Sequence, residues 1–371
     1  MRRLIPLLLA LCLLLGACAS TPEETPTEPT TESTTEATTE PTTEPTTEPT
    51  TEATTAAPEV LYRHPLTGEP LEEPWTGRAT AFVINNIEDC LPQYGIGSAD
   101  FIYELETEGG ITRLLAVFSD LKYVGTIGPV RSARTFFNSI SASYDAPIAH
   151  CGGSVRGIAG YHDLTGSKIS GWAHLNAQIY EGTYFFRDYT RYNSGVAWEH
   201  CLFTDGEKTQ ALLSKLGYNK VNEDGTDYGL QFADDVAVDG ETANEITVNF
   251  KWWKTTTLTY NADTGLYEAS QYDIDHIDGL TGETMAYKNV FVLYTNQTGK
   301  HDGYYTRSYY DLIGSGEGHF ALGGKIIPIK WSRADLNSPF SYTLEDGTPL
   351  TLGVGTSYVG IVDDSKTATY K

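Results

Sequence analysis

Two arginines, Arg131 and Arg134, stand three residues apart in the stretch "IGPVRSART", directly after a Gly-Pro pair. A guanidinium is permanently charged, and its planar fork of N–H donors matches the oxygens of a phosphate or a carboxylate. We predict a helix that begins near Arg131, with both guanidiniums on one face at its N-terminus. Basic side chains are unfavourable there unless a negative group lies nearby. The pattern therefore predicts an anion-binding site, phosphate being the favoured anion. The alternative is that the arginines pair with carboxylates of the chain itself.

A third arginine follows a run of carboxylates in "ELETEGGITR", which contains Glu104, Glu106, Glu108 and Arg113. Glu104 or Glu108 beside the arginines could act as a general base or a metal ligand. We favour the interpretation that the Gly-Gly pair forms a tight hairpin turn, with the carboxylates solvated or bound to arginine. If the site binds an anion, Arg113 should converge with the other two arginines on one open pocket.

Further polar residues end apolar runs that resemble strands. Asn85 lies at the end of "TAFVINN", and His150 precedes Gly152 and Gly153 in "APIAHCGGS". Asn85 could contact a ligand, because strand ends commonly hold ligand contacts in α/β folds. His150 could move protons near neutral pH, and the two glycines would let the backbone approach a ligand closely. The alternatives are an ordinary loop asparagine, a buried core histidine and a simple chain turn. For His150 we favour the core position.

These residues require a scaffold of alternating strands and helices. The runs 80–86, 100–106, 112–119 and 146–154 are typical of strands, and "TDGEKTQALLSKLGY" (204–218) is typical of a helix. Thr204 and Glu207 would form its capping box, and Gly217 would end it. We expect an α/β sandwich with a mixed sheet over residues 59–220. Beyond this domain, apolar and polar residues alternate, which predicts a second, mostly antiparallel β-rich domain over 221–371 with no helix after Gly240. The fold class of the whole chain is therefore expected to be α+β.

The N-terminus predicts a lipoprotein. Arg2 and Arg3 precede a Leu-rich segment too short to span a bilayer, and "LGAC" ends at Cys18. We expect a signal peptide over residues 1–17, cleavage before Cys18, lipid such as palmitate on its sulfur, and anchoring at a membrane surface. Residues 18–58 are rich in Thr, Glu and Pro. They predict a disordered stalk, because such a segment has too little apolar surface to fold.

Charge and cysteine content exclude several classes of function. The formal net charge of -24 argues against nonspecific nucleic-acid binding, which needs a basic surface. Cys90, Cys151 and Cys201 remain in the mature chain, and their disulfide state is open. No standard zinc spacing and no common catalytic signature is present, so we expect no metal and no cofactor, and catalysis is left open.

Several long segments resemble one bacterial family. "LPQYGIGSADFIYELETEGGITRLLAVF", "IGPVRSAR" and "LFTDGEKTQALLSKLGY" resemble the N-terminal domain of the YerB-like lipoproteins, and "DLIGSGEGHFALGGKIIPIKWSR" and "GTPLTLGVGTSYVGIVD" resemble their C-terminal domain. The resemblance implies an envelope lipoprotein on the extracytoplasmic face, of unassigned biochemical role. The family tends to have Pro-His-Asn where this chain has Glu199-His200-Cys201. His200 is thus a candidate polar or acid–base residue, and an asparagine contact at position 201 is in doubt.

A fainter similarity concerns the order of features along the chain. An arginine begins a strand, two more arginines follow it, and the next strand ends in Gly-Gly. This order is similar to the LytR-CpsA-Psr envelope phosphotransferases. The similarity implies a phosphate-binding site made of Arg113, Arg131, Arg134 and the Gly152-Gly153 turn. It also implies that the ligand is an envelope glycopolymer or its lipid pyrophosphate carrier, and that the protein transfers a phosphate-linked group. The alternative is a noncatalytic scaffold or a module that docks an unidentified protein partner. For the latter, "YFFRDYTRYNSG" (184–195) could be a stacking surface for sugars or for a partner, although core packing is the favoured interpretation.

Overall fold

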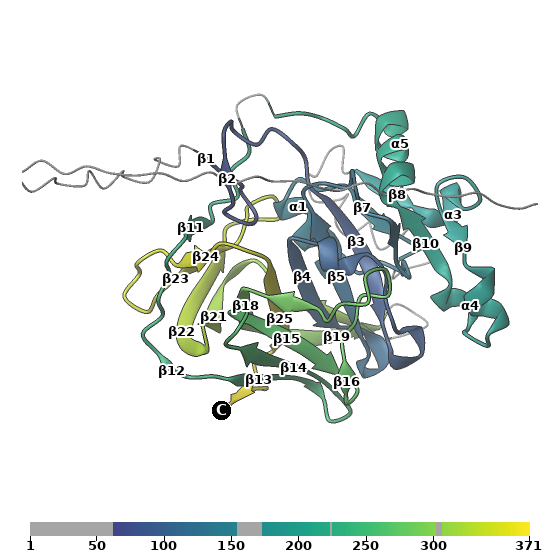
Figure 1. Cartoon of the computed structure of the whole chain (residues 1–371). Coiled ribbons are helices and arrows are strands. Elements are labelled where there is room, and N and C mark those ends of the chain that lie inside the picture. Colours follow the sequence, from purple (N-terminus) through teal and green to yellow (C-terminus); the bar gives the residue numbers. More distant parts are fainter. Residues whose placement is uncertain (1–61, 154–172, 223–224, 302–305) are drawn as a thin grey trace, which may run out of the picture. The chain divides into compact units, whose positions relative to one another are not determined.

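One large mixed sheet runs through the computed structural model, which describes residues 62–153, 173–222, 225–301 and 306–371 (Figure 1). In these residues the sheet has eleven strands. Their spatial order is β12 (Glu241–Thr242), β22 (Lys325–Arg333), β21 (Gly314–Leu322), β18 (Asn289–Thr295), β25 (Ser357–Asp363), β4 (Phe101–Glu106), β5 (Thr112–Phe118), β3 (Thr80–Asn86), β7 (Ile148–His150) and β8 (His174–Asn176), with β23 (Ser341–Thr343) paired to β22.

The centre of the sheet joins early and late parts of the chain. β25 runs parallel to β4, with Tyr358 opposite Ile102, and parallel to β18 on its other side. β5 pairs antiparallel with both β4 and β3, and β7 runs parallel to β3. Strands β3, β4 and β5 are buried along their whole length. Burial on both faces explains why these segments are nearly continuous apolar runs.

A second, antiparallel sheet covers one face of the large sheet. Its strands are β16 (Ile274–Asp275), β15 (Leu266–Gln271), β14 (Lys254–Asn261), β13 (Glu245–Lys251) and β26 (Thr369–Tyr370), with β17 (Ala286–Tyr287) paired to β15. In β13 the buried side chains are Ile246, Val248 and Phe250, which alternate with half-exposed ones. They share one apolar core with Ile102 and Leu114 of the large sheet, because the period of two places them all on facing surfaces.

The helix α1 (Thr135–Ser143) covers the opposite face of the large sheet. Phe136, Phe137 and Ile140 belong to a core that also contains Val83 and Leu115. Side chains of odd-numbered residues in β3 and β5 therefore point toward α1, and even-numbered ones point toward the second sheet.

The remaining elements lie around this framework. The α-helices are α3 (Ala177–Tyr180), α4 (Tyr189–Asn193) and α5 (Gly206–Leu216), and the 3-10 turns are η1 (Glu88–Cys90), η2 (Ile96–Ser98), η3 (Glu108–Gly110) and η5 (Trp198–His200). Among the small sheets, β1 (Tyr62–Arg63) pairs with β2 (Pro70–Leu71), β11 (Gln231–Ala233) with β24 (Thr351–Gly353), and β19 (Gln297–His301) with β20 (Thr306–Tyr310). In a three-stranded sheet, β10 (Leu202–Asp205) lies between β6 (Thr126–Ile127) and β9 (Phe186–Arg187).

Much of the expected secondary structure is confirmed. The strands expected at 80–86, 100–106 and 112–119 are β3, β4 and β5, and the run 146–154 contains the shorter β7. Mixed and antiparallel sheets are both present, and the described residues after Gly240 contain no helix. Gly217 ends α5 in the left-handed conformation, with φ of 69°. The N-terminal α/β sandwich stays a prediction.

Two helix starts were predicted wrongly. α5 is capped by Asp205, whose carboxylate accepts the N–H of Lys208 at 2.7 Å, whereas Thr204 lies in β10 opposite Ile127. The strand pairing keeps Thr204 extended, so it cannot form the capping box with Glu207. α1 begins at Thr135 rather than near Arg131, because the backbone before it is extended and bonds to neighbouring segments. Arg131 and Arg134 therefore do not share a helix face.

The large sheet crosses the boundary that we placed between residues 220 and 221, since β4 and β25 are neighbours. The division into two domains stays a prediction. Among the helices of the described ranges, none has the length and apolar character needed to cross a bilayer. Cys18, the Thr/Glu/Pro stalk and the segment after Gly153 lie outside the described residues.

Candidate anion-binding site

The buried guanidinium of Arg113 lies at the centre of the candidate site. Arg113 stands on β5 beside Asn85 of β3 and Leu105 of β4, on the face that α1 covers. Its side chain is only 4% exposed, and Nη1 donates to the carbonyl of Ser132 at 2.6 Å. Nε finds no hydrogen-bond acceptor among the described residues. The sheet thus brings a cation into the interior with its bonding capacity partly unused.

The segment before α1 brings Arg131 and Arg134 to the same face. The N–H of Arg131 donates to the carbonyl of Val83 at 2.8 Å, and the N–H of Ala133 donates to the carbonyl of Gly152 at 3.1 Å. These bonds tie the segment to the middle of β3 and to the residues that follow β7. Gly152 has φ of 77°, a conformation that favours glycine, and its carbonyl also binds Nδ1 of His150 at 2.8 Å. Gly152 therefore positions the arginine segment through its backbone.

Arg134 is already neutralised by the chain itself. Its Nη2 lies 2.5 Å from Oε2 of Glu108, and its Nε contacts both oxygens of the same carboxylate at 2.7 and 2.9 Å. Arg307 of β20 also reaches Glu108, with Nη1 at 3.5 Å from Oε2. Burial alone would raise the pKa of Glu108, but the bonds and charge of Arg134 outweigh it and lower that pKa. For Arg134 the ion-pair alternative is thus the observed one.

Arg131 is less fully paired. Its Nη2 lies 3.6 Å from Oε1 of Glu199, whose side chain is 59% exposed, and its Nε has no acceptor in the described part of the chain. The next residue, His200, is buried, and its Nδ1 accepts the Nδ2 amide of Asn85 at 2.6 Å. Burial, followed by the charge of Arg131, lowers the pKa of His200. Asn85 Oδ1 is a buried acceptor without a donor among the described residues.

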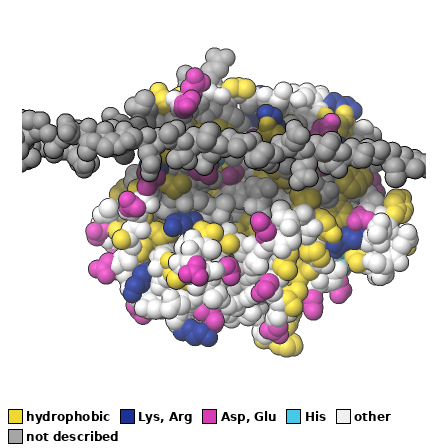
Figure 2. Space-filling model, viewed as in Figure 1, with side chains coloured by type: hydrophobic (Ala, Val, Ile, Leu, Met, Phe, Trp, Pro, Cys, Tyr) yellow, Lys and Arg dark blue, Asp and Glu magenta, His cyan; other side chains and the backbone are white. Residues whose placement is uncertain are grey.

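Four guanidiniums and two carboxylates lie in this group, which we call the arginine cluster and define as Arg113, Arg131, Arg134, Arg307, Glu108 and Glu199. Burial, and then the charges of Arg134 and Arg131, lower the pKa of Arg113 well below its usual value. Burial likewise lowers the pKa of Arg131. Carboxylates are spread over the face of the molecule seen in Figure 2, in agreement with the formal net charge of -24. The cluster thus gathers cations on a molecule whose formal net charge is negative.

Glu104 does not belong to this cluster, and its predicted place beside the arginines is wrong. Arg113 and Glu104 project from opposite faces of the sheet. The Glu104 carboxylate binds Lys254 Nζ at 2.9 Å and accepts bonds from the hydroxyls of Thr112, Thr256 and Tyr358. Burial alone would raise the pKa of Glu104, but the charge of Lys254 and the hydroxyls reverse this and lower it. Glu104 is therefore an ion-pair partner inside the core, and it lacks the free oxygen that a general base needs.

His150 occupies the core position that we favoured. It is fully buried, and burial lowers its pKa to about 3, so the imidazole is neutral at neutral pH. An acid–base role for His150 or His200 stays a prediction, as do the ligand contacts of Asn85 and Gly153. Gly153 is the last described residue before the gap at 154–172.

Cys90, Cys151 and Cys201 are free thiols. Cys90 and Cys201 are buried, and burial raises the pKa of Cys90 to about 12. Within the described ranges, no three His, Cys, Asp or Glu side chains gather as the ligands of a metal ion would.

Two members of the arginine cluster were missed by sequence analysis. Arg307 comes from β20, far along the chain, and no local pattern connects it with Glu108. Glu199 could have been suspected, since it directly precedes His200, but its ion pair with Arg131 depends on how β10 pairs with β6 and β9. Both contacts are consequences of tertiary structure.

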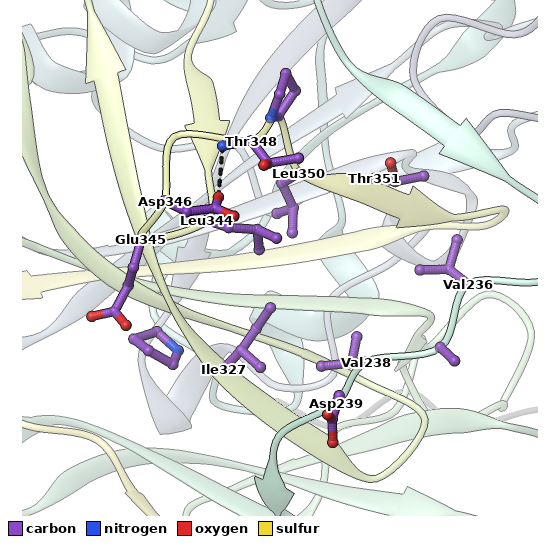
Figure 3. A pocket seen from close by; sticks show the side chains of 13 residues that line it. Val236, Val238, Asp239, Ile327, Leu344, Glu345, Asp346, Thr348, Leu350 and Thr351 are labelled. Carbon is purple, nitrogen blue, oxygen red and sulfur yellow. Dashed lines mark hydrogen bonds between the residues drawn. The ribbon is translucent and has the colours of Figure 1, made fainter.

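A separate surface groove of about 620 Å³ contains none of the predicted site residues. Figure 3 shows Leu344 and Leu350 on one side of it, and Ile327, Val238 and Val236 on the other. Its acidic side chains include Asp346, which is engaged because its carboxylate caps the turn by accepting the N–H of Thr348 at 2.8 Å. The groove offers no excess of cations and does not resemble the predicted anion site.

Comparison with protein families gives two adjacent matches. Residues 66–219 match the N-terminal domain of the family described as "Protein of unknown function (DUF3048)", and residues 246–359 match the C-terminal domain of the same family. Together the two matched ranges include every member of the arginine cluster.

The chain is also similar to YerB of Bacillus subtilis (strain 168), which carries a lipoprotein name. The two are 28% identical over 314 residues, which is 81% of this chain and 86% of the relative. The crystal structure of YerB protein from Bacillus subtilis has a TM-score of 0.71 with this structure and 25% sequence identity. That similarity covers 84% of this chain and 99% of the solved one.

Proposed function

This chain belongs to the family of YerB-like lipoproteins, and from that premise we propose that it binds a phosphate-bearing ligand of the cell envelope at its arginine cluster. In the same proposal lipid on Cys18 anchors the protein to the extracytoplasmic face of a membrane. The signal-like residues 1–17 and the lipoprotein name of the relative support the anchor.

The observation that carries the proposal is the incomplete pairing of Arg113. A buried charge is costly unless a partner compensates it, and the deep interior of proteins rarely contains an unpaired cation. Arg113 is 4% exposed, has an unused Nε, and makes no ion pair with a carboxylate among the described residues. A bound anion would provide the missing compensation.

The unused donors of the cluster favour a phosphate over a carboxylate. Arg113 and Arg131 each keep a buried Nε without an acceptor among the described residues, and the Glu199 carboxylate lies 3.6 Å from Arg131. A phosphate monoester carries between one and two negative charges near neutral pH and has several acceptor oxygens. Arginine forks bind such oxygens in pairs. A phosphate offers more of these oxygens to the two guanidiniums than a carboxylate does.

The proposal is one of binding rather than phosphotransfer. Glu104 is engaged by Lys254, and Glu108 is engaged by Arg134, so neither carboxylate is available as a base. The alternative function, a noncatalytic scaffold, is favoured by one contact. Glu108 joins Arg134 to Arg307 and so connects η3, the residue before α1, and β20 as a structural ion pair would.

Calorimetric titration of the full chain in detergent micelles tests the proposal. Inorganic pyrophosphate should bind the wild type at low salt, where screening is weak. Arg131→Ala should lower the affinity by about tenfold, which corresponds to ~1.4 kcal/mol. Arg63→Ala is the matched control, because Arg63 forms its ion pair with Asp234 and has no contact with the cluster. Absence of heat with the wild type, or equal affinities for wild type and Arg131→Ala, would contradict the proposal and leave the scaffold function.

A further inference from the structure

Three exposed aromatic side chains form a group beside the arginine cluster. Tyr189, Tyr192 and Trp198 are 63%, 46% and 40% exposed. The ring centroids of Tyr189 and Trp198 lie 5.6 Å apart, and those of Tyr192 and Trp198 lie 5.1 Å apart, both edge to face. We call these three residues the aromatic patch. Figure 1 shows α4, which carries both tyrosines, at the margin of the molecule.

The patch is held in place by polar contacts beneath it. Asp188 caps α4 by accepting the N–H groups of Thr190 and Arg191 at 2.8 and 3.1 Å. The buried Arg191 side chain donates to the carbonyls of Cys90 and Pro92, and so fastens α4 to the loop after β3. A surface that is ordered before binding loses less entropy when a ligand arrives.

Arg187 fixes the tryptophan. Its Nη1 donates to the carbonyl of Trp198 at 2.9 Å, and its guanidinium lies 4.9 Å from the centroid of a Trp198 ring. Glu181 binds the same guanidinium at 2.8 and 3.0 Å. The patch is thus bordered by polar groups that can exchange hydrogen bonds with hydroxyls.

One 3-10 turn connects the patch to the arginine cluster. In η5, Trp198 belongs to the patch, Glu199 pairs with Arg131 at 3.6 Å, and His200 binds Asn85 at 2.6 Å. An anion bound at Arg131 would therefore be a neighbour of the aromatic patch.

We propose that the aromatic patch is a sugar-binding subsite, which stacks on the ring of a glycosyl phosphate whose phosphate is bound by Arg131 and Arg113. This inference rests on the proposed function, because it adds a second contact to the same ligand. The C–H groups on the flat face of a pyranose carry partial positive charge and are attracted to the negative face of an aromatic ring. A phosphate at the arginines and a ring on the patch require a ligand with both groups adjacent, which is the chemistry of a glycosyl phosphate.

The test is a titration of the full chain in detergent micelles with three probes. They are inorganic phosphate, N-acetylglucosamine and N-acetylglucosamine 1-phosphate. For the wild type, the glycosyl phosphate should bind at least about tenfold more tightly than phosphate, because two subsites act together. Trp198→Ala should remove this gain and leave the affinity for phosphate unchanged. Trp252→Ala, which removes a tryptophan that is 92% exposed in the turn between β13 and β14, should behave as the wild type.

The outcomes separate this inference from the proposed function. If the wild type binds neither phosphate nor the glycosyl phosphate, both are overturned. If phosphate binds but the glycosyl phosphate gains nothing, or if Trp198→Ala retains the gain, only the sugar subsite is overturned and a protein-docking role for the patch takes its place. A second arm compares UDP-N-acetylglucosamine with a polyprenyl diphosphate-linked sugar. This arm distinguishes nucleotide-linked from lipid-linked sugars as the source of the ligand. If either binds more tightly than phosphate, and Trp198→Ala removes that gain in affinity, the result supports the sugar subsite.

Discussion

Arg113 and Arg134 are both 4% exposed, yet the chain treats their charges differently. Arg134 has Glu108 at 2.5 Å, whereas Arg113 donates to the carbonyl of Ser132 at 2.6 Å and has no carboxylate partner in the described residues. Removing one member of a buried ion pair is strongly destabilising, while removing an uncompensated buried cation relieves a desolvation cost. The two arginines therefore have opposite consequences for stability.

We expect Arg134→Met to lower the free energy of unfolding by about 3 kcal/mol, because it leaves Glu108 without its main partner. Arg113→Met should leave that free energy unchanged or raise it by roughly 1 kcal/mol, while phosphate affinity falls about tenfold. Urea denaturation of both variants without added anion is the measurement. Equal losses of stability would show that Arg113 is a structural residue, and would remove the main support for the anion site.

At the scale of elements, the hairpin of β4 and β5 determines which polar side chains can meet. Glu106 stands opposite Thr112 and Leu105 stands opposite Arg113. Successive side chains of a strand point to opposite faces. The turn that sets this register is η3, in which Gly109 and Gly110 have φ of 76° and 79°. The interpretation of the Gly-Gly pair as a tight turn is confirmed.

The two glycines should respond differently to substitution. A Cβ on Gly109 would contact nothing within 4 Å, whereas a Cβ on Gly110 would lie 2.8 Å from Cγ of Lys251 and 3.2 Å from a ring carbon of Trp253. Gly109→Ala should therefore cost only the backbone strain of a positive φ, about 1 kcal/mol. Gly110→Ala should cost about 2 kcal/mol or more, because the clash adds to the strain. Thermal unfolding of the matched pair gives the comparison, and a smaller loss for Gly110→Ala would be evidence against this packing.

At the scale of the whole molecule, one buried ion pair joins the two family domains. Glu104 of β4 lies in the first matched region and Lys254 of β14 in the second, and both are almost fully buried. Around them, Asn86 donates to Glu104 Oε1 at 2.8 Å, and Gln271 accepts from Lys254 Nζ at 2.9 Å. Together with the pairing of β4 and β25, this network makes the two regions interdependent.

Lys254→Met should lower the free energy of unfolding by about 3 to 5 kcal/mol, since it leaves the Glu104 carboxylate buried without a cation. The double variant Glu104→Gln with Lys254→Met should recover part of the loss, because no buried charge remains. Urea denaturation followed by signals from both regions should show a single transition in the wild type. Additive losses in the double variant would mean that the two side chains do not act as a pair.

Local patterns were sufficient for several features. The alternation and continuity of apolar residues identified β3, β4 and β5, and glycine chemistry identified the turn at 109–110 and the end of α5. Long family-like segments identified the family. These signals are local because hydrophobic period and left-handed backbone conformations depend on neighbouring residues.

Only the tertiary structure decided which charged groups meet. It separated Glu104 from Arg113 by the thickness of a sheet, and it gave Glu108 to Arg134 and Arg307. The physical reason is register: a shift of one residue between paired strands moves every side chain to the other face, and spacing along a single strand does not reveal it. Local sequence patterns thus determined the family and much of the secondary structure. The long-range pairing of strands decided which arginine has no carboxylate partner among the described residues.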